Sequence, residues 1–145
     1  MRNVHRFRLV GACLLAVVVA VAPATAAATQ SHGVTAKIIA QSTVDGKDYI
    51  LREITVAPGG GTGWHFHQGT LYGLVRQGTL THNAADCAVD GIYHAGDALT
   101  EPSGREHVHI GRNLGATPLV LDVLYVDPAG SPLSDDAPNP GCPFQ

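Results

Sequence analysis

Two His-x-His pairs are the part of this sequence best suited to chemistry, His65-Phe66-His67 and His107-Val108-His109. Successive side chains of a β-strand point to opposite faces, so both histidines of a pair share one face if each pair lies on a strand. Two neighbouring imidazoles offer two nitrogen ligands to a metal ion. The spacing therefore predicts a metal site, without selecting a reaction. The alternative is that the histidines are only packed or surface residues.

The other histidines and acids near these pairs carry a weaker signal. His82 and His94 each stand alone and are interpreted as ordinary, partly exposed histidines. Glu101 either orients an imidazole from behind or is a solvated loop charge. Glu101 and Glu106 are the only general-base candidates close to the pairs in the sequence.

Short strands must position the two pairs. Residues 34–44 and 49–57 are rich in β-branched side chains and flank Asp45-Gly46, a dipeptide typical of hairpin turns. Residues 64–75 would carry the first pair, with a kink at Gln68-Gly69, and residues 107–111 the second. Residues 118–126 form the clearest strand pattern. No helical period is sustained outside the N-terminal region, so the sequence predicts an all-β sandwich or small barrel.

The N-terminal region has the pattern of a secretory signal peptide. Three arginines precede an apolar run over 9–22, and Ala24-Thr25-Ala26 offers a small-residue cleavage site. The run is short for a membrane span, so we expect cleavage rather than stable insertion, with an uncleaved anchor as the alternative. The predicted organisation is a signal peptide at 1–26, a flexible segment at 27–33, a barrel at 34–126 and a tail at 127–145. The expected location is secreted or cell-envelope (periplasmic).

Charge and cysteine content limit the partners and indicate the compartment. The chain has 9 basic and 12 acidic residues, and the signal peptide takes three of the basic ones, so no basic patch is available for nucleic acid. Cys87 and Cys142 remain after processing and are predicted to form a disulfide that tethers the tail. Two free thiols, or two metal ligands, are the alternatives.

Around the first histidine pair the chain resembles a known family, the single-domain cupins of the type-2 kind, which are small jelly-roll barrels. Their first motif has Gly, five residues, His-x-His, three or four residues, Glu, six residues and Gly. This chain matches it at Gly59, His65, His67 and Gly78, but Leu71 stands at the Glu position.

The second cupin motif has Gly, five residues, Pro-x-Gly, two residues, His, three residues and Asn. Gly96, Pro102-Ser103-Gly104 and His107 fit its first part, whereas His109 and Asn113 fit its last part, as if the loop held two extra residues. The resemblance covers about 34–126 and implies an all-β cupin-type barrel, a double-stranded β-helix or jelly roll. The Asn spacing favours His109 as the third ligand, with His107 as the alternative or an additional ligand.

The resemblance implies one divalent transition metal, which could be Zn, Fe, Ni, Cu or Mn. Cupins usually use three histidines and one glutamate, so Leu71 would leave a neutral all-histidine site, which disfavours hard cations such as Mn²⁺. The first hypothesis is a secreted cupin that binds a metal and a small molecule. Cupin-like thiol and diketone dioxygenases use all-histidine sites, so a metal-dependent dioxygenase is the second hypothesis. A non-catalytic structural or interaction module is the third. A homodimer is compatible with each.

Overall fold

The computed structural model of the protein describes residues 28–145. The predicted signal peptide, residues 1–26, and the first residue after it lie outside the described residues. The described chain forms ten strands and one short 3-10 helix, which are β1 (His32–Val44), β2 (Lys47–Gly61), β3 (His65–Phe66), β4 (Thr70–Gln77), β5 (Thr79–Ala84), β6 (Val89–His94), β7 (Ala98–Glu101), η1 (Arg105–His107), β8 (His109–Arg112), β9 (Leu119–Pro128) and β10 (Asp135–Asp136).

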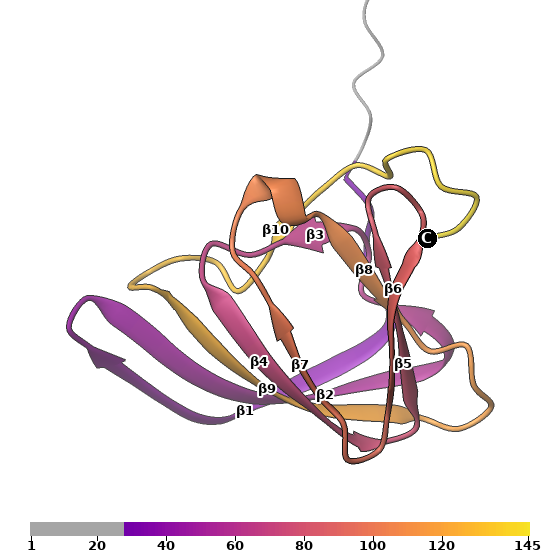
Figure 1. Ribbon diagram of the computed structural model, residues 1–145. Helices are drawn as coiled ribbons and strands as arrows, with labels where there is room; N and C mark the ends of the chain where they lie inside the picture. The colour runs from indigo at the N-terminus through magenta and orange to yellow at the C-terminus, as the bar shows by residue number, and fades with distance from the viewer. Residues whose placement is uncertain (1–27) are drawn as a thin grey trace, which may run out of the picture.

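The strands form one strongly curved sheet that closes almost completely into a barrel (Figure 1). Its main path runs β10-β3-β8-β2-β9-β4-β7, β1 extends the sheet beside β2, and the β5–β6 hairpin joins through β8. The predicted all-β, jelly-roll barrel is confirmed. None of the helical residues in the described part of the chain forms a helix long and apolar enough to cross a membrane.

The β1–β2 hairpin extends from one end of the barrel and turns where the sequence predicts. Asp45 and Gly46 both have positive φ, 49° and 74°, as a two-residue turn of type I′ requires, and Val44 pairs with Lys47 across it. Beyond the turn, β2 pairs with β1 along one edge and with β9 along the other. The hairpin is therefore continuous with the barrel wall.

The kink expected at Gln68-Gly69 divides the first histidine segment into β3 and β4. At Gly69 the backbone passes so close to β9 that an added Cβ would overlap the carbonyl oxygen of Val126. Only glycine fits such an approach. The break lets β3 pair with β8 while β4 pairs with β9 and β7, so the first histidine pair faces the second histidine segment.

The second histidine segment differs from the predicted single strand. Residues 105–107 form the 3-10 turn η1, in which the His107 N–H donates to the Gly104 carbonyl, and β8 begins only at His109. The expectation that His107 and His109 share a strand face is therefore wrong. The two extra residues before β8 are taken up by this turn.

Two apolar clusters fill the molecule. The larger one occupies the barrel between β2, β4 and β9 and contains Ile54, Val56, Leu71, Val75, Leu80, Leu99, Leu119, Leu121, Val123 and Tyr125. The smaller one lies under the C-terminal tail and contains Trp64, Ile110, Ala137 and Cys142. Trp64 is fully buried and stacks on Phe144 with ring centroids 5.9 Å apart.

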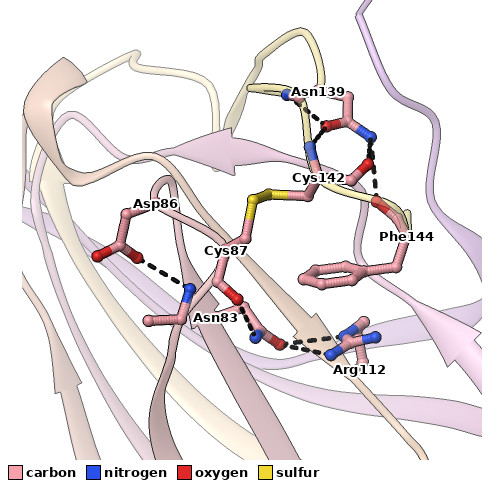
Figure 2. The surroundings of a disulfide bond; sticks show 9 residues. Asn83, Asp86, Cys87, Arg112, Asn139, Cys142 and Phe144 are labelled. Carbon is pink, nitrogen blue, oxygen red and sulfur yellow. Dashed lines mark hydrogen bonds between the residues drawn. A yellow bond between two sulfur atoms is a disulfide. The ribbon is translucent and has the colours of Figure 1, made fainter.

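The predicted disulfide joins Cys87, in the β5–β6 loop, to Cys142 in the tail, with Cα atoms 5.5 Å apart (Figure 2). Beside it, Arg112 donates to the Asn83 side-chain oxygen and lies 3.7 Å from the Phe144 ring centroid. The start of the described chain is also held, because Thr29 is buried and its hydroxyl accepts the Trp64 N–H. The segment expected to be flexible and the tail thus pack on the same end of the barrel.

Candidate metal centre

Three histidines and one glutamate converge inside the barrel, and their possible ligand atoms all lie within 4.8 Å of one another. His65 on β3 pairs directly with His109 on β8, and their ring centroids are 4.5 Å apart. His67 follows β3, with its ring 4.8 Å from His65. Glu101 is the last residue of β7. The group therefore joins residues from three separate strand segments.

Backbone carbonyls fix the orientation of each imidazole. Nδ1 of His65 donates to the Gly63 carbonyl at 2.8 Å, Nδ1 of His67 to Leu133 at 2.8 Å, and Nδ1 of His109 to His107 at 2.7 Å. A neutral imidazole carries one N–H, so these hydrogen bonds place the proton on Nδ1 and the lone pair on Nε2. Such backbone contacts are typical of metal-bound histidines, because they set the tautomer and the direction of the ring.

The lone pairs face a carboxylate. Oε2 of Glu101 lies 3.2 Å from Nε2 of His67 and 3.3 Å from Nε2 of His109. Both Nε2 atoms are buried and have no hydrogen-bond partner. Three neutral imidazoles and a carboxylate would then bring only acceptors together, which is costly in a buried site unless a cation lies among them. The donor set fits a divalent transition metal, for which imidazole nitrogen and carboxylate oxygen are both suitable.

The pKa shifts indicate the same need for a cation. Burial, together with the charges of His109 and His67, lowers the pKa of His65 to about 3, so this ring stays neutral near pH 7. Burial also opposes protonation of His109, but Glu101 outweighs it and raises the His109 pKa above its usual value. Burial would raise the pKa of Glu101, yet the two facing histidines hold it well below its usual range. The raised pKa of His109 and the lowered pKa of Glu101 both favour a positive charge next to this carboxylate.

Glu101 takes the place of the carboxylate that the first motif lacks. Leu71, at the motif's Glu position, is buried in the core, and its directly opposite partner across the β4–β7 ladder is Glu101. Residues directly opposite each other on antiparallel strands project from the same face. The neighbouring strand therefore supplies an acid close to where the motif would place one. The prediction of a neutral all-histidine group is corrected by this pairing, which no spacing within either motif reveals.

The other candidate residues lie around this group. The His107 side chain is 43% exposed and lies beside Glu106, so only its backbone carbonyl touches the group, through His109. His82, interpreted as an ordinary histidine, is largely buried and stacks on His109 with centroids 4.7 Å apart. Nδ1 of His82 pairs with Asp90 at 2.5 Å. His94 is exposed, as expected.

Three hollows reach the group from different sides. A small apolar space of about 60 Å³ lies within the barrel between His65, His67 and Glu101. A second hollow of about 180 Å³ opens beside Glu101 and His109 and is also lined by His82 and His107. A third, of about 210 Å³, lies against His65 and His67 and reaches Arg52 and Tyr125. A small molecule could therefore approach the group from two open sides.

The fold and the His/Glu group together define a class of protein, a small β-barrel with a candidate metal site in its interior. The family model for the cupin domain matches residues 52–126, and the chain belongs to the cupin family. No curated protein matches the chain.

Solved structures agree on the fold. A cupin domain from Bordetella pertussis Tohama I is 22% identical over 66% of this chain and 94% of its own, with a TM-score of 0.55. The polyketide cyclase RemF from Streptomyces resistomycificus is 20% identical over 77% and 82%, with a TM-score of 0.59. An oxalate oxidase in complex with the substrate analogue glycolate is 20% identical over 68% and 53%, with a TM-score of 0.56. At these identities the likeness shows the fold alone.

Proposed function

We propose that this protein is an exported cupin that binds one divalent transition metal through His65, His67, His109 and Glu101, together with a small molecule in an adjoining hollow. One observation carries the proposal. The possible ligand atoms of three imidazoles and one carboxylate lie within 4.8 Å of one another, and the Nδ1 of each imidazole is already used by a backbone carbonyl. Of the two candidate third histidines, His109 is the one inside the group. The backbone carbonyl of His107 accepts the hydrogen bond from His109 Nδ1.

The carboxylate widens the choice of metal compared with an all-histidine site. Three neutral imidazoles favour Zn²⁺, Fe²⁺, Ni²⁺ or Cu²⁺, and an added carboxylate also suits Mn²⁺. When bound, such a metal would supply Lewis acidity or redox chemistry to a small ligand. The protein's own residues would fix the ligand directions, because each imidazole is held by a backbone carbonyl and Glu101 is flanked by His67 and His109.

A metal-dependent oxidoreductase of the dioxygenase type is the second candidate. The hollow of about 180 Å³ beside Glu101 and His109 favours it, because a catalytic metal must keep a side open to its substrate. Glu101 supplies the carboxylate that the first motif lacks at Leu71. Oxalate oxidase, an enzyme by its name, has the same fold at an identity that establishes the fold alone.

Export is part of the proposal. The basic start, the apolar run and the Ala24-Thr25-Ala26 site support it from the sequence. The disulfide between Cys87 and Cys142 supports it too, because such bonds persist mainly in oxidising compartments. The partners we propose are small molecules, and neither nucleic acid nor a membrane is among them.

Metal titration of the purified, metal-stripped chain tests the site. Zn²⁺, Ni²⁺, Cu²⁺, Mn²⁺ or Fe²⁺ (the last without oxygen) at 100 times its dissociation constant should stabilise the fold by about 2.7 kcal/mol. We expect a higher melting temperature at pH 7.5 and a much smaller rise at pH 5, because the raised pKa of His109 favours its protonation as the pH falls, and a protonated imidazole cannot bind metal. The double change His65→Ala with His67→Ala should abolish the rise, whereas His94→Ala should preserve it.

Two results would contradict the proposal. The first is a double variant that stays folded and responds to metal as the parent does. The second is a parent protein that none of these metals stabilises at either pH. A response retained in the double variant but lost in His107→Ala would move the site to η1, where His107 lies beside Glu106.

A further inference from the structure

Arg52 is a cation on the inner face of the barrel, and no acid among residues 28–145 forms an ion pair with it. On β2 the side chains of Ile50, Arg52 and Ile54 alternate onto the face that meets Val123 and Leu121 of β9. Ile50 and Ile54 belong to the apolar core on this face, whereas Arg52 places a guanidinium there. Burying part of a charged side chain in such surroundings is unfavourable unless a partner compensates it.

The acids nearest to Arg52 along the strands are engaged elsewhere. Glu53 points to the outer face and pairs with Lys37 at 2.7 Å. Asp122, also outward, pairs with Arg76 at 2.6 Å. Among residues 28–145 Arg52 forms no ion pair within 4.0 Å, and its Nε is buried without a hydrogen-bond partner. The guanidinium thus has unused donor capacity.

The hollow beside Arg52 leads to the histidines. Its volume is about 210 Å³, and its lining includes Arg52, Tyr125, His65 and His67. The Tyr125 ring stands between the two ends, with its centroid 5.7 Å from the Arg52 guanidinium carbon and 5.9 Å from the His67 ring. Asp136 also lines the hollow but is exposed to solvent, so water screens its charge.

Tyr125 adds a neutral donor to this side of the hollow. Its ring lies against both Arg52 and His67, and its phenolic O–H can donate to an oxygen of a ligand in the hollow. Arg52 is the only arginine or lysine among residues 28–145 that lines this hollow, and its planar fork of N–H donors matches the two oxygens of a carboxylate.

We propose that Arg52 and this hollow bind the carboxylate of a small organic acid, whose other end reaches toward His65 and His67. Only the second part, in which the other end of the acid reaches toward the histidines, rests on the proposed function, because it names the class of small molecule that would meet the metal. Recognition of the carboxylate by Arg52 belongs to the protein alone and does not depend on a bound metal.

A titration followed by ¹H–¹⁵N NMR tests Arg52 directly, because its Nε–H gives its own signal. The probes are acetate, lactate, malonate and benzoate, with lactamide as the neutral counterpart of lactate and sulfate as an inorganic anion. We expect at least one of the acids to shift the Arg52 Nε–H signal of metal-stripped protein, and lactamide to leave it unchanged. Arg52→Gln should weaken binding of that acid at least about 10-fold, as loss of a charge-assisted pair implies. Arg52→Lys should weaken it less.

The matched control is Arg105→Gln. Arg105 is exposed and lies over the Phe66 ring, outside the hollow, so its loss should leave acid binding unchanged. The inference is overturned if no acid in the panel shifts the Arg52 signal, if lactate and lactamide act alike, or if sulfate binds more tightly than every carboxylate. Equal binding by the parent and a folded Arg52→Gln variant would also overturn it.

Metal-loaded protein separates this inference from the proposed function. If Zn²⁺ binds but Arg52→Gln takes up the acid as the parent does, the carboxylate assignment fails and the metal site stands. If no metal binds while the acids still shift Arg52 in the parent, the proposed function fails and the carboxylate site stands. When both hold, we expect the acid to bind more tightly to metal-loaded than to metal-stripped protein.

Discussion

Replacing His65 by asparagine should remove a loss of stability that the parent protein suffers between pH 7.5 and pH 5. His65 is 9% exposed, and its Nδ1–H donates to the Gly63 carbonyl at 2.8 Å. The asparagine side-chain amide can occupy a similar position and keep that hydrogen bond, so the variant removes the titrating ring with little structural change. Burial first, and the charges of His109 and His67 second, lower the His65 pKa to about 3 in the folded protein.

The sign and size of the effect follow from linkage. Between pH 6.5 and pH 3 the unfolded chain binds a proton at His65 that the folded chain does not, so acid favours unfolding. From an unfolded value of about 6.5, this contribution is nearly zero at pH 7.5 and costs the parent about 2 kcal/mol at pH 5. The raised pKa of His109 acts in the opposite sense, adding stability that is lost as pH rises through it. The depressed pKa of Glu101 matters only below about pH 4.5.

Urea unfolding at pH 7.5 and pH 5, in the presence of a chelator, measures the effect. The quantity to compare is the free energy of unfolding of the parent minus that of His65→Asn. This difference should be about 2 kcal/mol smaller at pH 5 than at pH 7.5. His94→Asn, at an exposed histidine, is the matched control and should show no such change. If the free energies of unfolding of the parent and His65→Asn differ by the same amount at both pH values, the lowered pKa of His65 and the placement of its ring in a buried cluster are refuted.

Three further predictions concern other parts of the chain. Replacing Cys87 and Cys142 by serine should lower the free energy of unfolding by about 4 kcal/mol, as expected for a loop with a sequence separation of 55, and an unchanged urea midpoint would contradict this. Gly69→Ala should cost roughly 3 kcal/mol, because the new Cβ would overlap the Val126 carbonyl oxygen; a melting temperature equal to the parent's would show that β9 can move aside. N-terminal sequencing of exported protein should start at or within a few residues of Ala27, and an intact N-terminus would refute cleavage.

The sequence alone determined the class of fold and most of the candidate metal site. Strand alternation, glycine-rich turns and the Asp45-Gly46 hairpin signal are local features, so they could be interpreted without knowing which strands pair. His65 and His67 were predicted from a two-residue spacing, and a third histidine, His109 with His107 as the alternative, from motif positions. The disulfide followed from the number of cysteines expected in the exported chain, because two thiols in an oxidising compartment have each other as partners.

Only the tertiary structure decided which acid joins the histidines and which histidine of the second pair does. Glu101 lies 30 positions beyond Leu71, and only the pairing of β4 with β7 brings the two opposite each other. His107 was drawn away from the site by the 3-10 turn, whose formation depends on how the chain enters β8. Arg52 gave no signal in the sequence, since an arginine within a strand is ordinary until the closed barrel shows that it faces inward and has no ion pair among residues 28–145. Each of these outcomes depends on contacts between residues distant in sequence, which spacing along one strand does not encode.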